Sequence, residues 1–489
     1  MADNVSFREI PDDIRVPGTY MEIDPSRADQ GVATMPYVRL LAGQMLTGGT
    51  AAPNELIPVS SPDQVAQLAG RGSQLHRMAI ASFDADKTLP MQIIATPDAA
   101  AGQAASGTIT VDGTATAAGT LYLYVGGQRH MIGVQNGDDA ADVAASIAAV
   151  LSMNADLEVT ATAATAVVTL TAKHKGESGN GIDVRVNYYL GEILPPGITL
   201  AISAMSGGTG NPDVAPVLAA LKGDFYSIVH PWTDAASMAQ FETECAERFT
   251  ALRQEDAHQF VCLRGTYGEL TTYGDAHNSA HTTVLPAEGR MRSPWVIAAA
   301  ASAAATVRGS SDPARPFRGM VLPNIEPPAE KDRFTWEERN NLLKKGISTL
   351  MSTAAGETAL EQIATTYKVN SFGMPTRAYF KIQSKWTAAY FRYALRQRMT
   401  SMFPDFKLAS DGTNFAPGQA MVTPSVLKAT IVAFARELEY AGVIEDIEQF
   451  KTDLLVVRSI ADPNRVNSVA APNLVNQFDV FAAAIQFIN

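Results

Sequence analysis

The chemistry most suggested by residue type and spacing is metal binding by Asp275, His277 and His281. Two histidines four positions apart can hold one metal ion when both lie on one face of a helix. Here Asn278 and Ser279 separate the pair, His281 enters the strand-like sequence HTTVLP, and no glutamate stands between the histidines as in an HExxH motif. The spacing therefore favours a solvated loop over a metal site.

Phosphate chemistry is suggested by the glycine-rich sequence HKGESGNGID at residues 174–183. This segment joins one strand-like sequence to another, so it presents no helix N-terminus to an anion. We interpret it as a mobile hairpin tip. Elsewhere, no GxxxxGK(S/T), GxGxxG or GxSxG motif occurs at a strand-to-helix turn, where a phosphate cradle or a nucleophile would lie.

The sequence therefore assigns no catalytic, cofactor-binding or metal-binding residue and predicts no cofactor. Cys245 and Cys262 lie within or beside apolar patterns without CxxC spacing, which predicts reduced, buried thiols. A structural protein is the favoured class. A cytoplasmic α/β enzyme with a cofactor or a metal-dependent hydrolase site is the alternative.

Composition limits the class further. The chain has 489 residues, 46% hydrophobic and 18% charged, which is ordinary for a folded protein of two to four domains. Its net charge of -12 argues against a surface that coats nucleic acid. The longest apolar run, residues 295–305, is too short to span a membrane, and the polar N-terminal sequence MADNVSFREIPDD does not resemble a signal peptide. We therefore expect neither export nor a membrane anchor.

Alternating helix and strand patterns over most of residues 60–363 predict a mostly parallel sheet with helices on both faces. Ser61 followed by Pro62 favours a helix start, and Thr335 with Glu338 forms a capping box. The predicted strands and helices that carry this alternation are residues 91–95, 225–229, 234–252, 258–263, 281–286 and 294–307.

One segment interrupts the alternation. Linker-like sequences at 96–106 and 206–213 bracket short strands, a tight Gly126-Gly127 hairpin and a helix capped by Asp138 or Asp139. Val143, Ile147, Val150 and Leu151 share one face of that helix. The segment is predicted to be a small inserted α+β domain.

Residues 374–399 carry six basic residues and no acidic one. On a helix beginning near Thr376, the spacing places five of these side chains along one slowly drifting stripe. Because exposed faces usually mix both signs of charge, a wholly basic stripe suggests an acidic partner surface, although a solvated face is the alternative. The residues of this basic stripe are Arg377, Lys381, Lys385, Arg392 and Arg396.

Both ends of the chain contain apolar segments that lack an obvious local strand partner. Residues 475–489, VNQFDVFAAAIQFIN, would bury both faces of a strand, and a free edge of this kind invites aggregation. Residues 1–30 are short alternating segments broken by prolines. We predict that both are extended arms that pair between subunits, through Val5, Phe7, Ile10, Phe478, Val480, Phe481, Ile485 and Phe487.

Six segments carry a family resemblance in their sequence and order. They are FREIPDDIRVPGTYMEID from residue 7, WTAAYFRYALRQRM from 386, KLASDGTNFAPGQAMVTP from 407, FARELEYAGVIEDIEQFKTDLLVVR from 434, DPNRVN from 462 and PNLVNQFDVFAAAIQF from 472. Together they resemble the tail sheath proteins of Mu-like contractile phages. The resemblance covers about 30 residues at the N-terminus and about 120 at the C-terminus most closely.

The resemblance implies a subunit that polymerises with six-fold helical symmetry around an inner tail tube. It implies an extended, metastable sheath that contracts on baseplate triggering and drives the tube through the host envelope during genome ejection. The implied partners are further copies of the chain, the tail tube protein, and the baseplate and tail terminator proteins, with no nucleic acid and no membrane binding by the subunit. The implied location is the virion tail, assembled in the bacterial host cytoplasm.

The expected fold class is multidomain, α/β and α+β. In sheaths of this kind the C-terminal domain faces the tube, and we assign the basic stripe to that surface. The inserted domain is not a general sheath feature, so the resemblance gives it no role. The expected parts are an N-terminal arm at 1–30, a middle α/β domain at 31–95 and 207–372, the inserted domain at 96–206, a tube-facing C-terminal domain at 373–474, and a C-terminal strand arm at 475–489.

Overall fold

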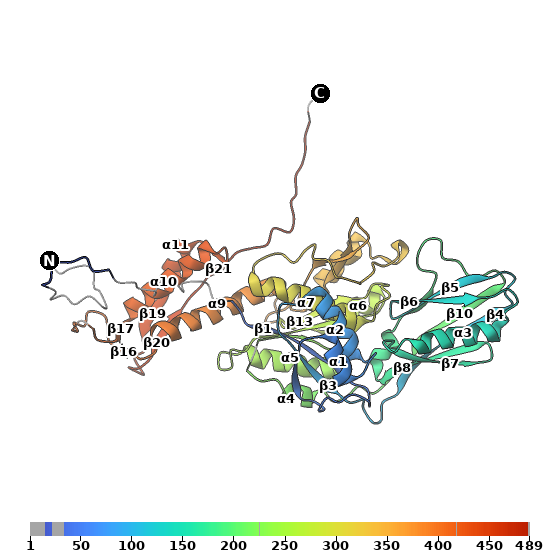
Figure 1. Ribbon diagram of the computed structural model, residues 1–489. Helices are drawn as coiled ribbons and strands as arrows, with labels where there is room; N and C mark the ends of the chain where they lie inside the picture. Colours follow the sequence, from blue (N-terminus) through green and yellow to red (C-terminus); the bar gives the residue numbers. More distant parts are fainter. Residues whose placement is uncertain (1–14, 22–33, 224, 417, 488–489) are drawn as a thin grey trace.

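The computed structural model describes residues 15–21, 34–223, 225–416 and 418–487, and shows an elongated molecule (Figure 1). A six-stranded sheet lies at its centre in the order β13-β12-β11-β1-β3-β2. All neighbouring pairs in this sheet are parallel except β2 with β3, which confirms the predicted mostly parallel α/β fold. The strands are β1 Tyr37–Gln44, β2 Leu56–Val59, β3 Met91–Thr96, β11 Phe225–Val229, β12 Ala257–Leu263 and β13 Thr282–Pro286.

Helices cover both faces of this sheet. Alternate residues of β11 point into opposite layers: Phe225 and Val229 belong to the core that includes α7, whereas Tyr226 and Ile228 belong to the core that includes α5. Strands buried on both faces are typical of parallel sheets. The helices of this region are α1 Pro62–Ala69, α2 Gln74–Ala85, α4 Ala215–Ala219, α5 Ala235–Phe249, α6 Tyr267–Ala276, α7 Pro294–Ser311 and α8 Trp336–Lys344.

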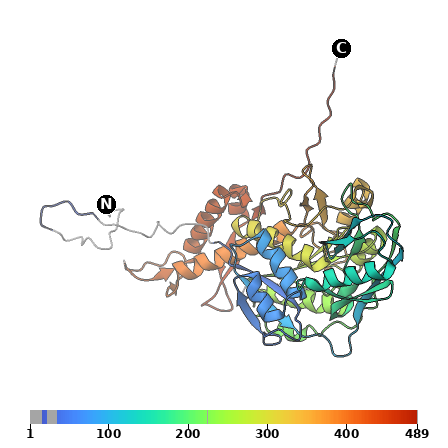
Figure 2. The same ribbon diagram turned by 45° about the vertical axis from the view of Figure 1, so that its right-hand side comes forward.

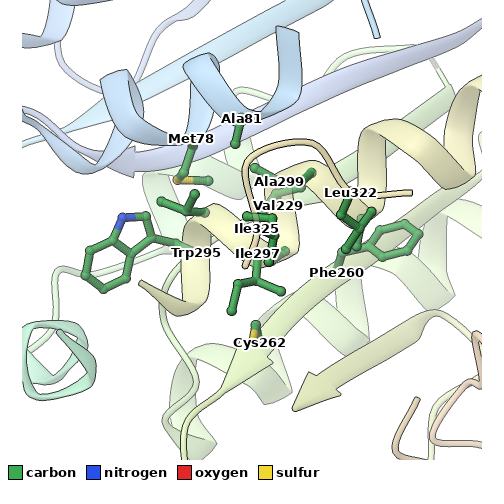
Figure 3. Close-up of a cluster of buried hydrophobic side chains, with 14 of the residues drawn as sticks. Met78, Ala81, Val229, Phe260, Cys262, Trp295, Ile297, Ala299, Leu322 and Ile325 are labelled. Carbon is green, nitrogen blue, oxygen red and sulfur yellow. The ribbon is translucent and has the colours of Figure 1, made fainter. Parts of the chain in front are cut away.

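The alanine-rich helix α7 lies in the middle of the larger core, between the sheet and α2. Figure 3 shows Met78 of α2 above α7 and Ile297 of α7 pointing toward Cys262 of β12. Small side chains from Ala298 to Ala305 allow the helix to approach the sheet and α2 closely. Cys245 and Cys262 are free and buried, as predicted, and burial raises the pKa of each thiol to about 12.

Residues 104–206 form two antiparallel sheets, one α-helix and one short 3-10 helix at one end of the molecule (Figure 1). Gly126 and Gly127, both with positive φ, form the predicted tight turn between β5 and β6. Asp139, not Asp138, caps α3 through a capping box with Asp142. The elements are β4 Ala104–Gly113, β5 Gly119–Val125, β6 Gln128–Val134, α3 Ala140–Met153, β7 Val159–Ala164, β8 Val167–Lys175, η2 Glu177–Gly181, β9 Val184–Val186 and β10 Ile198–Ser206.

The last third of the chain contains two long helices and several two-stranded sheets (Figures 1 and 2). Helix α9 begins at Ile382, not near Thr376 as predicted, and runs from the central sheet to the helices α10 and α11. The elements are η3 Glu330–Asp332, β14 Thr349–Ser352, β15 Thr358–Gln362, α9 Ile382–Met402, β16 Lys407–Leu408, β17 Met421–Val422, α10 Pro424–Tyr440, β18 Ile444–Glu445, α11 Ile447–Asp453, β19 Leu455–Arg458, β20 Val466–Val469 and β21 Asn473–Leu474.

Helix α9 packs against two regions that share one continuous hydrophobic core. Near its start, Trp386 is fully buried against Tyr37 of β1 and Phe260 of β12, with ring centroids 5.1 and 6.4 Å away. One and a half turns later, Phe391 contacts Phe434 of α10 and Phe450 of α11. An unbroken helix buried in both regions makes them one mechanical unit.

Gly309 of α7 lies directly against the Trp386 ring of α9. A Cβ atom there would collide with the Trp386 ring. We therefore expect Gly309→Ala to destabilise the protein by about 1–3 kcal/mol through overpacking, in spite of alanine's better helix propensity. The urea concentration at the midpoint of unfolding measures this loss of stability. The matched control is Gly268→Ala in α6, where an added Cβ meets nothing within 4 Å and the midpoint is expected to stay or rise.

Candidate assembly interface

The C-terminal arm, defined here as residues 475–487, forms no helix or strand and leaves the body of the molecule (Figures 1 and 2). Its five predicted contact residues, all large and apolar, are 79–91% exposed. A row of apolar side chains on an unpaired backbone needs a strand partner from elsewhere. These residues are Phe478, Val480, Phe481, Ile485 and Phe487. Val5, Phe7 and Ile10 of the N-terminal arm lie outside the described residues.

The first part of the arm is attached to the body. Gln477 Nε2 donates a hydrogen bond to the Ala314 carbonyl at 3.0 Å, and Asp479 forms an ion pair with Lys381. The Arg318 guanidinium also reaches the Asp479 carbonyl oxygen, at 3.5 Å. Among the described residues beyond Asp479, none forms a hydrogen bond with the body. The arm is therefore free from Val480 onward.

The strands β19 and β20 form an exposed two-stranded ribbon, which precedes the arm in the sequence. They pair only with each other within the described residues, which leaves both outer edges open. Leu455, Val457 and Val469 are exposed on this ribbon, while α10 packs against β19. A two-stranded ribbon is only marginally stable by itself, so added strands would stabilise it.

The basic stripe does not form one exposed face. Lys385 is fully buried, Arg392 is half-buried, and Lys381 is paired with Asp479. Only Arg377 and Arg396 are exposed, and Arg377 and Lys381 precede the helix. The assignment of Lys385 to a tube-facing surface is therefore wrong for this structure, because its side chain lies inside the chain's own fold.

The electronegative partner of the stripe is the C-terminal end of α5 and the turn that follows it. Arg392 Nη1 donates to the Phe249 carbonyl at 2.7 Å, and its guanidinium lies 4.3 Å from the centre of the Phe249 ring. Arg396 reaches Gln254 Oε1 at 3.4 Å. A cation beside the last carbonyls of a helix is favoured by the helix dipole. Arg392 and Arg396 thus contact neutral acceptor groups of the same chain.

Lys385 and Asp256 form a fully buried ion pair between α9 and the start of β12. The Lys385 Nζ atom lies 2.6 Å from Asp256 Oδ1 and donates to the Ala257 carbonyl at 2.8 Å. Tyr37 donates its hydroxyl hydrogen to Asp256 Oδ2 at 2.8 Å. Burial and the neighbouring Asp256 carboxylate raise the pKa of Tyr37 well above its usual range.

The predicted metal candidates do not come together. Asp275 pairs with Lys345, His277 lies 3.0 Å from Glu242, and His281 packs beside Phe249. Both histidine rings are buried, so the preference for a solvated loop is also wrong. Within the described parts of the chain, no group of three or more histidine, cysteine or acidic side chains could hold a metal ion.

The glycine-rich segment is not a mobile hairpin tip. It forms the short 3-10 helix η2, which links β8 to β9 and packs against β4, β8 and β10. Ser178 accepts a hydrogen bond from Gln74 at 2.6 Å, and the Gly181 carbonyl accepts one from Arg264 at 2.8 Å. The segment therefore helps to fix the small sheets to the central sheet.

A buried cluster strengthens the same junction. Glu158, at the start of β7, accepts a hydrogen bond from Ser293 at the start of α7 and lies 3.7 Å from Arg77 of α2. Burial raises the pKa of Glu158, although Arg77 opposes this. Nearby, Arg71 holds Asp156 with two hydrogen bonds of 2.8 and 2.9 Å.

No helix in the described residues is long and apolar enough to cross a membrane.

An open strand ribbon, a free apolar arm and a sheet without the motifs of cofactor binding define a structural subunit with surfaces for assembly. Three phage tail sheath profiles match the chain: a β-sandwich domain at residues 100–209, a central domain at 207–366 and a C-terminal domain at 375–488. The β-sandwich match covers the inserted domain, so the expectation that this domain is not a general sheath feature is wrong. The sequence is 38% identical over 487 residues to the Mu-like prophage FluMu tail sheath protein of Haemophilus influenzae, covering 99% of this chain and 100% of that protein. The chain belongs to the phage tail sheath protein family.

The chain also resembles solved structures at lower sequence identity. The sheath tail protein of Desulfitobacterium hafniense is 14% identical, with a TM-score of 0.47 over 94% of this chain and all of that one. A chain of the anti-feeding prophage baseplate is 9% identical, with a TM-score of 0.48 over 97% of this chain and all of that one. Family membership makes the protein a structural tail sheath subunit and not an enzyme.

Sequence reasoning missed the residues that hold α9 and the arm in place. Asp256 stands in an ordinary polar turn, and its role follows only from the burial of Lys385. Asp479 is the one charged residue in the sequence from 475 to 489, which was a usable signal for an attachment point.

Removing the Lys385 charge would leave Asp256 buried without its cation. We expect Lys385→Met to destabilise the protein by about 3–5 kcal/mol, measured from urea unfolding of the isolated subunit. The double variant Lys385→Met with Asp256→Asn should lose less stability than Lys385→Met, because no unpaired charge stays buried. Arg396→Met, on the same helix but exposed, should change stability by less than about 0.5 kcal/mol. Equal losses for Lys385→Met and Arg396→Met would contradict this account.

Three buried histidines predict an acid-sensitive subunit. Burial lowers the pKa of His230 to about 4 and of His281 to about 2, and burial with nearby Lys385 lowers the pKa of His258. Below about pH 6.5 the unfolded chain binds protons that the folded chain does not, so stability must fall as pH falls. The urea concentration at the midpoint of unfolding should be lower at pH 5 than at pH 7.5. The decrease between these pH values should be smaller in His281→Leu. A midpoint that does not change between these pH values would refute the prediction.

Proposed function

We propose that this subunit polymerises helically around a tail tube and contracts to drive the tube through the host envelope during genome ejection. The observation that carries the proposal is the free apolar arm together with the open ribbon β19–β20. An arm from one copy can add a strand to the ribbon of a neighbour, with main-chain hydrogen bonds supplying affinity. The residues from Val480 to the last described position span roughly 26 Å when extended, which is a useful reach between subunits.

Strand addition of this kind generates a polymer. The arm and the ribbon are different surfaces, so the contact is head-to-tail, and such contacts form rings or open helices. We propose that the N-terminal arm, through Val5, Phe7 and Ile10, is the counterpart of the C-terminal arm on a neighbouring copy. Tail tube, baseplate and tail terminator proteins are the other proposed partners, and assembly is proposed to take place in the host cytoplasm.

Contraction is proposed to move each subunit as a rigid body while the arms keep neighbours joined. Helix α9 supports this, because one unbroken helix packs against the central sheet and against α10 and α11 within a continuous core. The free-energy difference between two packings of the lattice can drive the motion without a nucleotide. The domain that contains α10 and α11 is proposed to face the tube, with Arg377 and Arg396 as the remaining basic candidates for that contact.

Truncation after Asp479 tests the role of the arm. The attachments of Gln477 and Asp479 survive, so we expect a folded subunit with an unchanged urea midpoint that no longer forms hollow striated cylinders in electron micrographs. The unmodified chain serves as the positive control. Loss of folding in the truncated chain would mean that the segment belongs to its own core, and normal cylinders would refute the proposed strand exchange.

A competing peptide gives an independent measurement. A synthetic peptide of residues 475–489 should slow cylinder formation by the full chain, because it occupies the open ribbon edge. The control peptide carries Phe481→Pro and Ile485→Pro, which remove backbone donors and prevent strand pairing. Equal effects of the two peptides would show that the arm does not bind as a strand.

A further inference from the structure

A small hairpin formed by residues 368–376 presents two large apolar side chains to solvent. Its strands are joined by hydrogen bonds of 2.9 Å from Thr376 N–H to the Lys368 carbonyl and from Asn370 N–H to the Met374 carbonyl. At the tip, Phe372 is 87% exposed and Met374 is 61% exposed. We call these two side chains the knob. Single exposed apolar residues are common, but two on one ordered tip form a contact surface.

The tip is ordered by its own hydrogen bonds. The Asn370 side-chain oxygen accepts the backbone N–H groups of Phe372 and Met374, both at 3.0 Å. Gly373 adopts the positive φ of 76° that the turn requires. A partner that binds the knob therefore does not bear the entropy cost of ordering this loop.

The base of the hairpin is fixed to the end of α6. The Asn278 side-chain oxygen accepts the N–H groups of Lys368 at 2.7 Å and Val369 at 3.0 Å. The Lys368 ammonium donates to the carbonyls of Gly274 and His277, at the C-terminal end of α6, where a cation is favoured. The knob thus stands on a rigid support.

An open groove of about 780 Å³ runs along α6. The groove is lined by Leu263, Thr272, Tyr273, Ala276, Arg264 and the exposed Glu269. The Arg264 guanidinium donates to three carbonyls of its own chain. The exposure of Phe372 shows that the knob does not occupy this groove in its own chain. Any knob that fills the groove must come from another molecule.

We propose that the knob of one subunit inserts into the α6 groove of a second copy of this chain. The inference rests on the proposed function, since a helical polymer brings many copies of both surfaces together. Aromatic and methionine side chains are enriched in the cores of protein interfaces. The charges also match: exposed Arg377 follows the knob, and exposed Glu269 borders the groove. One copy can use its knob and its groove with different neighbours, so the contact is compatible with a growing lattice.

Photo-crosslinking in assembled cylinders tests the contact directly. The photoreactive residue benzoylphenylalanine replaces Phe372. Unlabelled subunits are mixed with subunits labelled with the heavy isotope of nitrogen, so that mass spectrometry distinguishes crosslinks between copies from crosslinks within one copy. We expect links from position 372 to residues 263–276 of another copy. The same probe at Leu252, which is 97% exposed, is the control and should give no such links.

Assembly strength provides the second measurement. Phe372→Ser with Met374→Ser should raise the critical concentration for cylinders roughly tenfold or more, as for loss of an interface anchor. Ala276→Glu, which places a charge in the groove, should have a similar effect, and Leu252→Ser should have little. All three variants should keep the urea midpoint of the unmodified chain.

The outcomes separate the two proposals. Cylinders that form normally from the double knob variant, or links that map only outside residues 263–276, would overturn the inference and leave the proposed function intact. Failure of the unmodified chain to form cylinders at all would count against the proposed function, and against the knob contact with it.

Discussion

The burial of α9 against the central sheet is the constraint on which the rest of the structure depends. Trp386 fills the space between β1, β12 and α7, and Lys385 beside it neutralises Asp256 in the same water-excluded layer. A buried ion pair adds little net stability relative to an apolar pair, because both charges lose their hydration. We infer that its main effect is on specificity, because another register of α9 would leave both charges buried without a partner.

This docking divides the molecule into a rigid body and a free segment. The junction with the small sheets is fixed by Glu158, Arg77 and the segment around Ser178, and α9 fixes the helical C-terminal region. The described residues after Asp479 form no hydrogen bond with the body, and the one hydrogen bond of residues 15–21 stays within that segment. A chain arranged in this way concentrates its conformational freedom in the part proposed to connect neighbouring copies.

The fold could be predicted from the sequence wherever local rules and burial agree. The parallel strands, the Gly126-Gly127 turn and the Thr335–Glu338 capping box follow from periodicity and capping chemistry, and all are observed. The basic stripe was misread because spacing reports which side chains share a helix face, not whether that face is covered by the same chain. The glycine-rich segment was misread for a similar reason, since the residues that it contacts, Gln74 and Arg264, lie far from it in the sequence. The strand pairing of the arm stays a prediction, because residues 475–487 form no strand within their own subunit.

Strand exchange and side-chain docking solve different parts of an assembly problem. Backbone hydrogen bonds between an arm and a ribbon join copies firmly, but they carry little information on orientation, because every residue offers the same donor and acceptor. Orientation requires side-chain contacts between rigid bodies, such as an apolar tip in a groove. A contact of that size is small compared with a stable protein interface, so it can be exchanged for another without separating the subunits. We infer that durable arms and exchangeable small contacts together would let one lattice hold two packings, because the arms keep copies joined while the small contacts decide which packing is populated.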